Sequence, residues 1–193
     1  MKTNFNKLEK VIIKIFFVGL ISIVQACVGT KPVSDTEAHP TDGQASRIKK
    51  TFFMQYSVTT NIKARQNKIW ALLTNVPEYP TWNSTVDSIK GQIALGEKIK
   101  LFVKISPGRE FSLKISEFSP EQRLVWEDGT TGIFKGVRTY TLSPKEDGST
   151  EFTMTEAFTG IMVPMIAGSL PDFRPSFEQY AADLKRKAES GAE

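Results

Sequence analysis

The segment from Ile133 to Thr159 constrains the fold most, because its two halves alternate in polarity around a run of turn-forming residues, Ser143–Ser149. An antiparallel hairpin in which the two apolar faces coincide pairs Leu142 with Phe152, Tyr140 with Met154, and Arg138 with Glu156. This register places one charged pair in the middle of an otherwise apolar, aromatic wall. We therefore expect the rest of the chain to pack against this wall and to enclose a cavity there.

The composition is that of an ordinary globular domain, with 193 residues of which 40% are hydrophobic and 24% charged. The formal net charge of +4 is modest, and like charges do not occur in blocks, so a nucleic-acid partner is not expected. The single cysteine, Cys27, and the single histidine, His39, exclude a disulfide framework and a Cys- or His-cluster metal site. The sequence contains no phosphate-binding glycine loop and no serine-nucleophile elbow, and we expect no cofactor and no metal.

Residues 1–26 have the layout of a signal peptide, in which basic residues precede an apolar run from Ile15 to Ala26 that is short for a membrane span. The end of this run and the following Cys27 resemble a bacterial lipoprotein signal, which implies cleavage before the cysteine and a diacylglyceryl group on its thiol. By the same resemblance, Val28 after the cysteine implies a bacterial cell-envelope location, lipid-anchored at the outer membrane and facing the periplasm. Ordinary secretory cleavage after Ala26 and an uncleaved anchor are the alternatives.

Residues 27–50 are rich in Gly, Pro, Ser, Thr and Asp and contain almost no large apolar residue. Such a segment buries too little surface to fold, and it predicts a flexible tether behind the lipidated cysteine. A single domain would then span residues 51–189, followed by a short tail at 190–193.

Residues 51–189 predict an α+β domain. The apolar pattern indicates a first strand, Thr51–Ala64, then a short helix, Gln66–Leu73, and a helical turn or tight loop at the proline-rich Asn75–Trp82. Further strands are expected at Val86–Ile93, Lys98–Ile105, Glu110–Phe118 and Arg123–Glu127. With the hairpin this makes about seven strands in an antiparallel meander. Apolar residues at three- and four-residue steps then predict a long helix at Pro171–Ala188.

The order of these segments resembles the START/SRPBCC superfamily, and its polyketide cyclase/dehydrase-like branch most closely. The resemblance covers about residues 52–189 and rests on seven segments: Ile69–Asn75, Tyr79–Asn83, Gly91–Ile93, Gly96–Glu97, Arg123–Trp126, Gly132–Gly136 and Asp147–Gly160. It implies a helix-grip fold, a curved antiparallel sheet wrapped around a long C-terminal helix, with two short helices after the first strand. It says little about function, because the superfamily includes lipid carriers, hormone receptors, cyclases and chaperone cofactors.

A sheet that wraps around one helix can leave an apolar void, and such voids bind small apolar ligands. Any one of the aromatic residues is explained more simply as core, but together with two methionines and the charged pair they predict a pocket. The expected lining is Trp82, Trp126, Phe134, Arg138, Tyr140, Met154, Glu156, Phe158, Met162, Met165, Phe173 and Phe177. Met162 and Met165 would form an adaptable mouth.

Arg138 and Glu156 are the only charges expected on the inner face, where a charge is costly unless it is paired. The first interpretation is a structural salt bridge, the second a polar anchor for a ligand head group, and the third catalysis. In the branch that the chain resembles, a histidine often stands where this sequence has Arg138. An arginine stays protonated, which disfavours a proton-shuttling role.

We therefore expect a membrane-tethered protein that binds a lipid-like or polyketide-like small molecule in a hydrophobic cavity and performs no chemistry. Two alternatives remain open. One is a cyclase- or dehydratase-like enzyme with Glu156 as base and Arg138 as enolate stabiliser. The other is an interaction module of the cell envelope whose cavity is filled with side chains.

Overall fold

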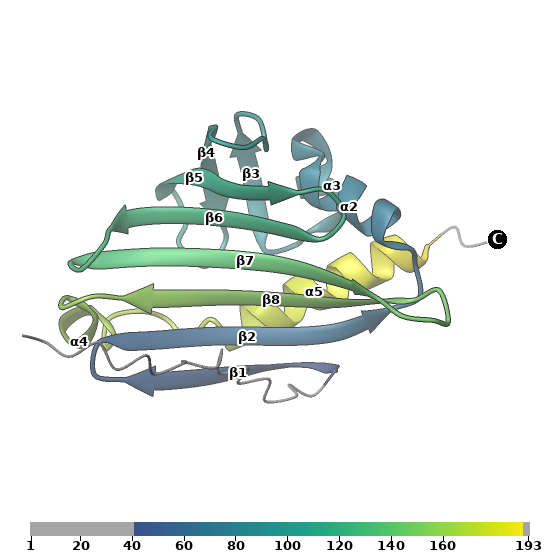
Figure 1. Ribbon diagram of the computed structural model, residues 1–193. Coiled ribbons are helices and arrows are strands. Elements are labelled where there is room, and N and C mark those ends of the chain that lie inside the picture. Colours follow the sequence, from purple (N-terminus) through teal and green to yellow (C-terminus); the bar gives the residue numbers. More distant parts are fainter. Residues whose placement is uncertain (1–40, 191–193) are drawn as a thin grey trace, which may run out of the picture. The chain divides into compact units, whose positions relative to one another are not determined.

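The computed structural model describes residues 41–190, which form one curved antiparallel sheet packed against a C-terminal helix. The sheet has eight strands in the order β1-β2-β8-β7-β6-β5-β4-β3 (Figure 1). The strands are β1 (Asp42–Lys50), β2 (Phe53–Ile62), β3 (Val86–Lys90), β4 (Lys98–Val103), β5 (Glu110–Ser119), β6 (Arg123–Thr130), β7 (Phe134–Pro144) and β8 (Thr150–Thr159). The α+β helix-grip architecture is thus confirmed, with one strand more than the sequence predicts.

The additional strand is β1, so the prediction of a flexible tether across residues 27–50 is wrong for Asp42–Lys50. The strand lies at the edge of the sheet, and most of its side chains are exposed. It is held by main-chain pairing with β2 and by the Ala45 N–H, which donates to Glu178 Oε1 of the C-terminal helix at 3.0 Å. Main-chain pairing leaves no apolar periodicity in a sequence, which is why composition alone misses this strand.

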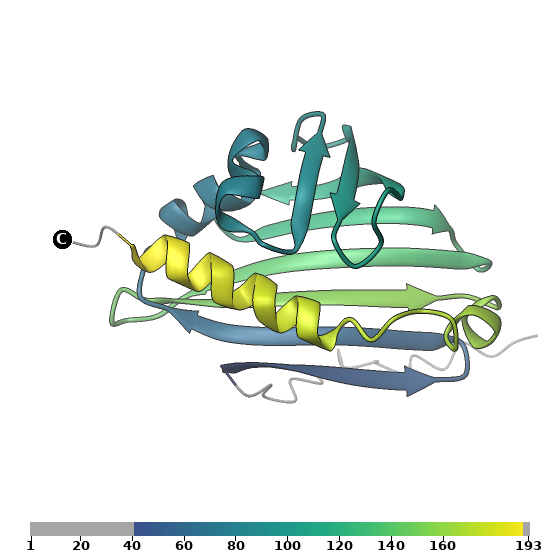
Figure 2. The ribbon, with the colours of Figure 1, turned by 180° about the vertical axis from the view of Figure 1, so that it is seen from behind.

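The helices lie after β2 and after β8. The short helices α2 (Gln66–Thr74), η1 (Val76–Glu78) and α3 (Tyr79–Trp82) follow β2, and α4 (Val163–Ile166) and α5 (Arg174–Glu189) follow β8. Figure 2 shows α5 lying across one face of the sheet, where it packs on β2, β1 and β8. The helix begins at Arg174, later than the expected Pro171, and Pro175 occupies its first turn, where the missing N–H costs no hydrogen bond.

Two polar contacts fix α5 over the inner face. Tyr180 lies 3.3 Å from the Tyr79 hydroxyl, measured between the two oxygens, and Tyr79 in turn donates to the Leu73 carbonyl at 2.8 Å. Asp183, fully buried, accepts hydrogen bonds from the Ser84 N–H at 2.7 Å and from the Ser84 hydroxyl at 2.6 Å. These contacts tie the middle of α5 to α3 and to the segment before β3.

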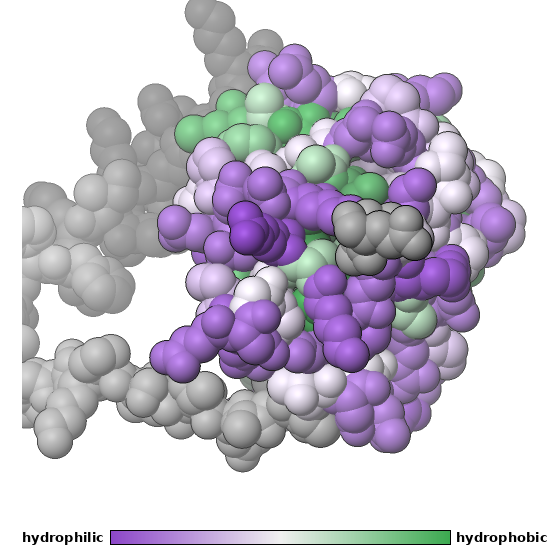
Figure 3. Space-filling model, turned by 90° about the vertical axis from the view of Figure 1, so that its right-hand side faces the viewer, coloured by the Kyte–Doolittle hydropathy of each residue, from purple (hydrophilic) through white to green (hydrophobic). Residues whose placement is uncertain are grey.

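The register of the hairpin is confirmed, because Leu142 pairs with Phe152, Tyr140 with Met154 and Arg138 with Glu156. One end of the molecule is mostly polar. Figure 3 shows the end of the molecule where α2 and the C-terminal turns of α5 lie, and hydrophilic residues cover most of it. Within residues 41–190, no helix has both the length and the apolar character needed to cross a membrane.

Candidate functional site

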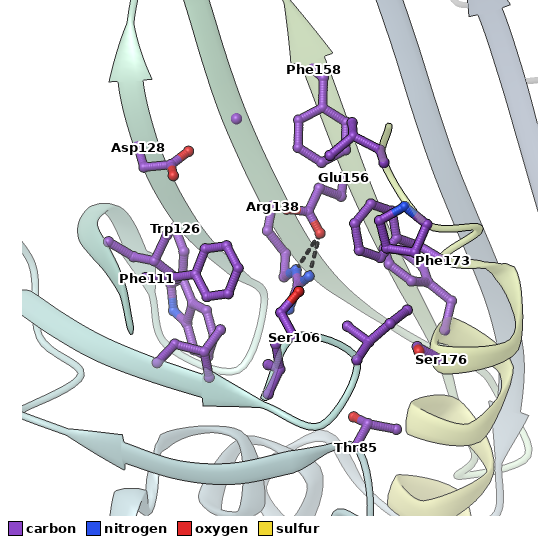
Figure 4. A pocket seen from close by; sticks show the side chains of 18 of the residues that line it. Thr85, Ser106, Phe111, Trp126, Asp128, Arg138, Glu156, Phe158, Phe173 and Ser176 are labelled. Atoms are coloured by element: carbon purple, nitrogen blue, oxygen red, sulfur yellow. Dashed lines mark hydrogen bonds and ion pairs between the residues drawn. The ribbon is translucent and has the colours of Figure 1, made fainter. Parts of the chain in front are cut away.

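A cavity of about 300 Å³ lies between the inner face of the sheet and the N-terminal half of α5 (Figure 4). Its apolar walls come from β4 to β8 on one side and from α5 and the segment before it on the other. They include Leu101, Phe111, Leu113, Trp126, Phe134, Met154, Phe158, Leu170, Phe173 and Phe177. This volume is at the lower end of the range for small-molecule sites.

The charged pair predicted from the hairpin register lines this cavity. Arg138 Nε donates to Glu156 Oε2 at 2.9 Å, and the Arg138 Nη2 group donates to the same oxygen. Each side chain is only 17% exposed. In Figure 4 the pair lies between Trp126 on one side and Phe173 on the other. The guanidinium carbon of Arg138 also lies 5.6 Å from the centroid of the Phe177 ring, a cation–π distance.

The electrostatics of the pair keep Arg138 charged. Burial alone would lower the pKa of Arg138, but the adjacent Glu156 carboxylate and Tyr140 together outweigh burial and raise that pKa above its ordinary value. Arg138 can therefore orient or stabilise a polar group, but it does not release a proton in the course of a reaction.

A second carboxylate, Asp128 on β6, also lines the cavity. It lies two residues after Trp126 and hence on the same face of the strand. Burial raises the pKa of Asp128, and the negative charge of Glu156 raises it further. Asp128 is not among the residues predicted from the sequence, because Asp-Gly is a common turn dipeptide and the predicted strand ends at Glu127. Continuing the alternation from Leu124 through Trp126 would have found it.

The sequence-predicted lining residues divide into two groups. Eight line the cavity: Trp126, Phe134, Arg138, Met154, Glu156, Phe158, Phe173 and Phe177. Four do not: Trp82, Tyr140, Met162 and Met165. Trp82 and Tyr140 are core residues, with the Trp82 ring centroid 5.7 Å from that of Tyr180 and the Tyr140 centroid 5.0 Å from that of Trp126. Met165 lies on α4 with 74% of its surface exposed and does not form the mouth.

The polar rim of the cavity comes from loops and was also missed. Ser106 lies between β4 and β5, Ser169 lies between α4 and α5, and Thr85 precedes β3. Arg109, at the end of the β4–β5 loop, lies with its guanidinium carbon 4.7 Å from the centroid of the Phe111 ring. Loop residues carry no periodicity, so the sequence offers no signal for them. Within residues 41–190, no group of three or more His, Cys, Asp or Glu side chains could hold a metal ion.

Solved structures with the same fold come from several bacteria. A protein from Rhodobacter sphaeroides matches with a TM-score of 0.57 and 16% identity over 75% of this chain and 97% of that chain. A conserved protein of unknown function from Enterococcus faecalis has a TM-score of 0.55 and 14% identity over 79% and 81%. A START superfamily protein from Mycobacterium smegmatis has a TM-score of 0.51 and 19% identity over 70% and 97%. At these identities the similarity shows the fold alone.

No curated protein matches the sequence. A family model does, and its description is "Polyketide cyclase / dehydrase and lipid transport". It matches residues 54–189, from the start of β2 to the end of α5, so β1 lies outside the match. Since the match covers more than half of the chain and the fold agrees with it, the chain belongs to the polyketide cyclase/dehydrase and lipid transport family.

Proposed function

We propose that the protein binds a small hydrophobic molecule in the cavity between the sheet and α5 and performs no chemistry on it. The observation that carries this proposal is a cavity of about 300 Å³ with apolar walls and one buried ion pair. Apolar burial supplies about 25 cal/mol per Å² of ligand surface removed from water. The family, which binds hydrophobic small molecules, supports a lipid-like or polyketide-like ligand.

The cavity favours this function over the two alternatives. An interaction module would have its interior filled with side chains, whereas a void lies directly beside Arg138. A cyclase- or dehydratase-like enzyme would use Glu156 as the base, whereas the two hydrogen bonds from Arg138 to Glu156 Oε2 favour a structural role for this side chain. Glu156→Gln separates binding from catalysis. Lost turnover with intact binding would support the enzyme, and unaltered binding with no turnover in either protein supports the carrier.

We also propose that the domain is tethered to a membrane through a lipid on Cys27, at the periplasmic side of the outer membrane. Cys27 lies outside the described residues, and the proposal rests on the signal-like pattern that precedes it. Two or more acyl chains would hold the domain stably, since each buried methylene contributes about 0.8 kcal/mol. Cys27→Ser is expected to release the protein from the membrane fraction, and a variant that stays membrane-bound would contradict the lipid anchor.

Native mass spectrometry of the purified protein tests the binding function. We expect a hydrophobic molecule to co-purify, and Leu113→Trp, which places a large ring on the cavity wall, to reduce its amount. Leu95→Trp is the matched control, because Leu95 is 66% exposed and lies outside the cavity. An empty wild-type protein that also takes up no added apolar ligand would contradict the proposal.

A further inference from the structure

The cavity contains a carboxylate that forms no ion pair with the part of the chain that the structure describes. Within residues 41–190, Asp128 takes part in none of the ion pairs, whereas Glu156 is paired with Arg138. Asp128 lies on β6, in the wall of the cavity, and Figure 4 shows its carboxylate above the Arg138–Glu156 pair. A carboxylate in a partly dry site is costly unless donors satisfy it. The Gly136 N–H and the charges of Arg109 and Arg138 offset burial only in part, because the pKa of Asp128 stays raised, so a further donor would stabilise the carboxylate.

The neighbouring strand makes room for this carboxylate. Asp128 pairs across the sheet with Gly136 of β7, and a Cβ at Gly136 would lie 2.5 Å from Asp128 Oδ1. The φ of Gly136 lies outside the left-handed region, so the backbone does not require a glycine there. What the glycine provides is space, because without a side chain at position 136 the Asp128 carboxylate can lie against β7 and face the cavity.

The charges around Asp128 discriminate between ligand head groups. Asp128 and Glu156 are both negative, and they lie close enough for Glu156 to affect the ionisation of Asp128. Arg138 is already engaged by Glu156, and Arg109 is exposed and lies over the Phe111 ring at the loop. An ionised carboxylic acid entering the cavity would therefore meet two carboxylates and one arginine that is already paired, and it would meet a second arginine, Arg109, only at the exposed rim. A hydrogen-bond donor at Asp128 would instead meet a carboxylate that forms no ion pair with any described residue.

We infer that Asp128 is a second polar anchor of the cavity, and that it receives the hydrogen-bond donor at the end of an apolar ligand, a hydroxyl or an ammonium group, in preference to a carboxylate. This inference rests on the proposed binding function and adds the class of head group. Trp126 and Phe158 would enclose the apolar part of the ligand, and the negative charge of Asp128 would repel an ionised acid.

Three probes with the same chain and different ends test the inference: decanol, decylamine and decanoic acid. Calorimetric titration at neutral pH is expected to show decanol and decylamine binding at least about tenfold more tightly than decanoic acid. Asp128→Asn keeps the shape and removes the charge, and it should reduce this preference by about tenfold. The tighter of the two donor-headed probes identifies whether the donor is a hydroxyl or an ammonium group.

Two further variants make the test specific. Gly136→Ala leaves Asp128 in the chain but displaces its carboxylate, so it should weaken the same preference in the same direction. Asp87→Asn makes the same chemical change at an exposed position of β3 outside the cavity and should leave all three affinities unchanged. Thermal unfolding of each variant checks that the fold is retained.

The outcomes separate this inference from the proposed function. If decanoic acid binds as tightly as decanol and decylamine, or if Asp128→Asn changes all three affinities equally, Asp128 does not select the head group, while the binding function stands. If none of the three probes binds to the wild-type protein, the proposed function fails and the anchor fails with it.

Discussion

Asp128 and Gly136 lie directly opposite each other on β6 and β7, and the Asp128 carboxylate fills the space that a side chain at position 136 would need. This places an acidic group in the wall of an apolar cavity, next to a second carboxylate, Glu156. The arrangement has a cost, because burial disfavours the ionised form of Asp128. That cost can be measured independently of any ligand.

Asp128→Asn is expected to stabilise the folded protein relative to wild type, and increasingly so as the pH rises. The folded state raises the pKa of Asp128 above its ordinary 3.8, chiefly through burial and then through Glu156. Between 3.8 and the raised pKa the folded state binds more protons than the unfolded state, so the wild-type free energy of unfolding falls as the pH rises. Above the raised pKa the difference between the two proteins becomes constant. Urea unfolding of both proteins across this range measures it, and a difference that does not vary with pH would contradict the assignment.

The Arg138–Glu156 pair should show strong coupling in a double-mutant cycle. Arg138→Met leaves Glu156 as a largely buried carboxylate without its partner and should cost about 3 kcal/mol. Glu156→Met leaves Arg138 unpaired at a similar cost. The double variant should be less destabilised than the sum of the two, because it leaves no uncompensated charge. Denaturant unfolding of the four proteins gives the coupling free energy between Arg138 and Glu156. Losses of stability that simply add would show that the two side chains do not stabilise each other.

The sequence predicts the part of the site that lies on regular strands. Alternation fixed the hairpin register, so Arg138, Glu156 and Phe158 were placed in the cavity wall from pattern alone. It could not separate lining residues from core residues, because both face inward. Tyr140 and Trp126 share the inner face, yet only Trp126 reaches the cavity.

The remaining errors have two physical causes. Segments held by main-chain hydrogen bonds, such as β1, need no apolar side chains and so carry no pattern. Segments whose position depends on tertiary packing, such as α4 with its exposed Met165, look apolar in sequence whether they line a cavity or lie on the surface. Asp128, by contrast, lies on a strand whose alternation is regular, and it escapes prediction because the Asp-Gly dipeptide, which usually forms a turn, here continues the strand.

Asp183 should contribute to stability through its charge. Although burial opposes ionisation, hydrogen bonds from Ser84, then Arg186 and Gln179, lower the pKa of Asp183 below 3.8. A lowered pKa means that the stabilisation is present above pH 3.8 and is lost as the pH falls through the lowered value. Asp183→Asn should cost about 2 kcal/mol at neutral pH. Ser84→Ala, which removes only the hydroxyl donor, should cost less.

Unfolding measurements at neutral and acidic pH check this expectation for Asp183. The destabilisation caused by Asp183→Asn should shrink toward acidic pH, because the wild-type carboxylate then loses its charge as well. A loss that is the same at both pH values would indicate a purely steric role for Asp183 in joining α5 to the segment before β3.

Removal of β1 should expose the edge of β2 and make the protein associate with itself. The strand lies outside the family match, yet it pairs with the main-chain groups of β2 along its length. Its Ala45 N–H also donates a hydrogen bond to Glu178 of α5. A chain that begins at residue 51 would present an unpaired edge strand, which templates pairing with a second copy. It should also lack the basic edge of Arg47, Lys49 and Lys50, which discourages such pairing in the intact sheet.

Size-exclusion chromatography at increasing concentration, compared with a chain that begins at residue 41, checks this expectation for β1. The shorter chain should unfold at lower denaturant concentration and elute earlier as its concentration rises, whereas the longer chain should do neither. If the two chains behave alike, β1 contributes nothing to the sheet and residues 42–50 act only as a spacer. If the shorter chain is destabilised but does not associate, another part of the molecule protects the edge of β2.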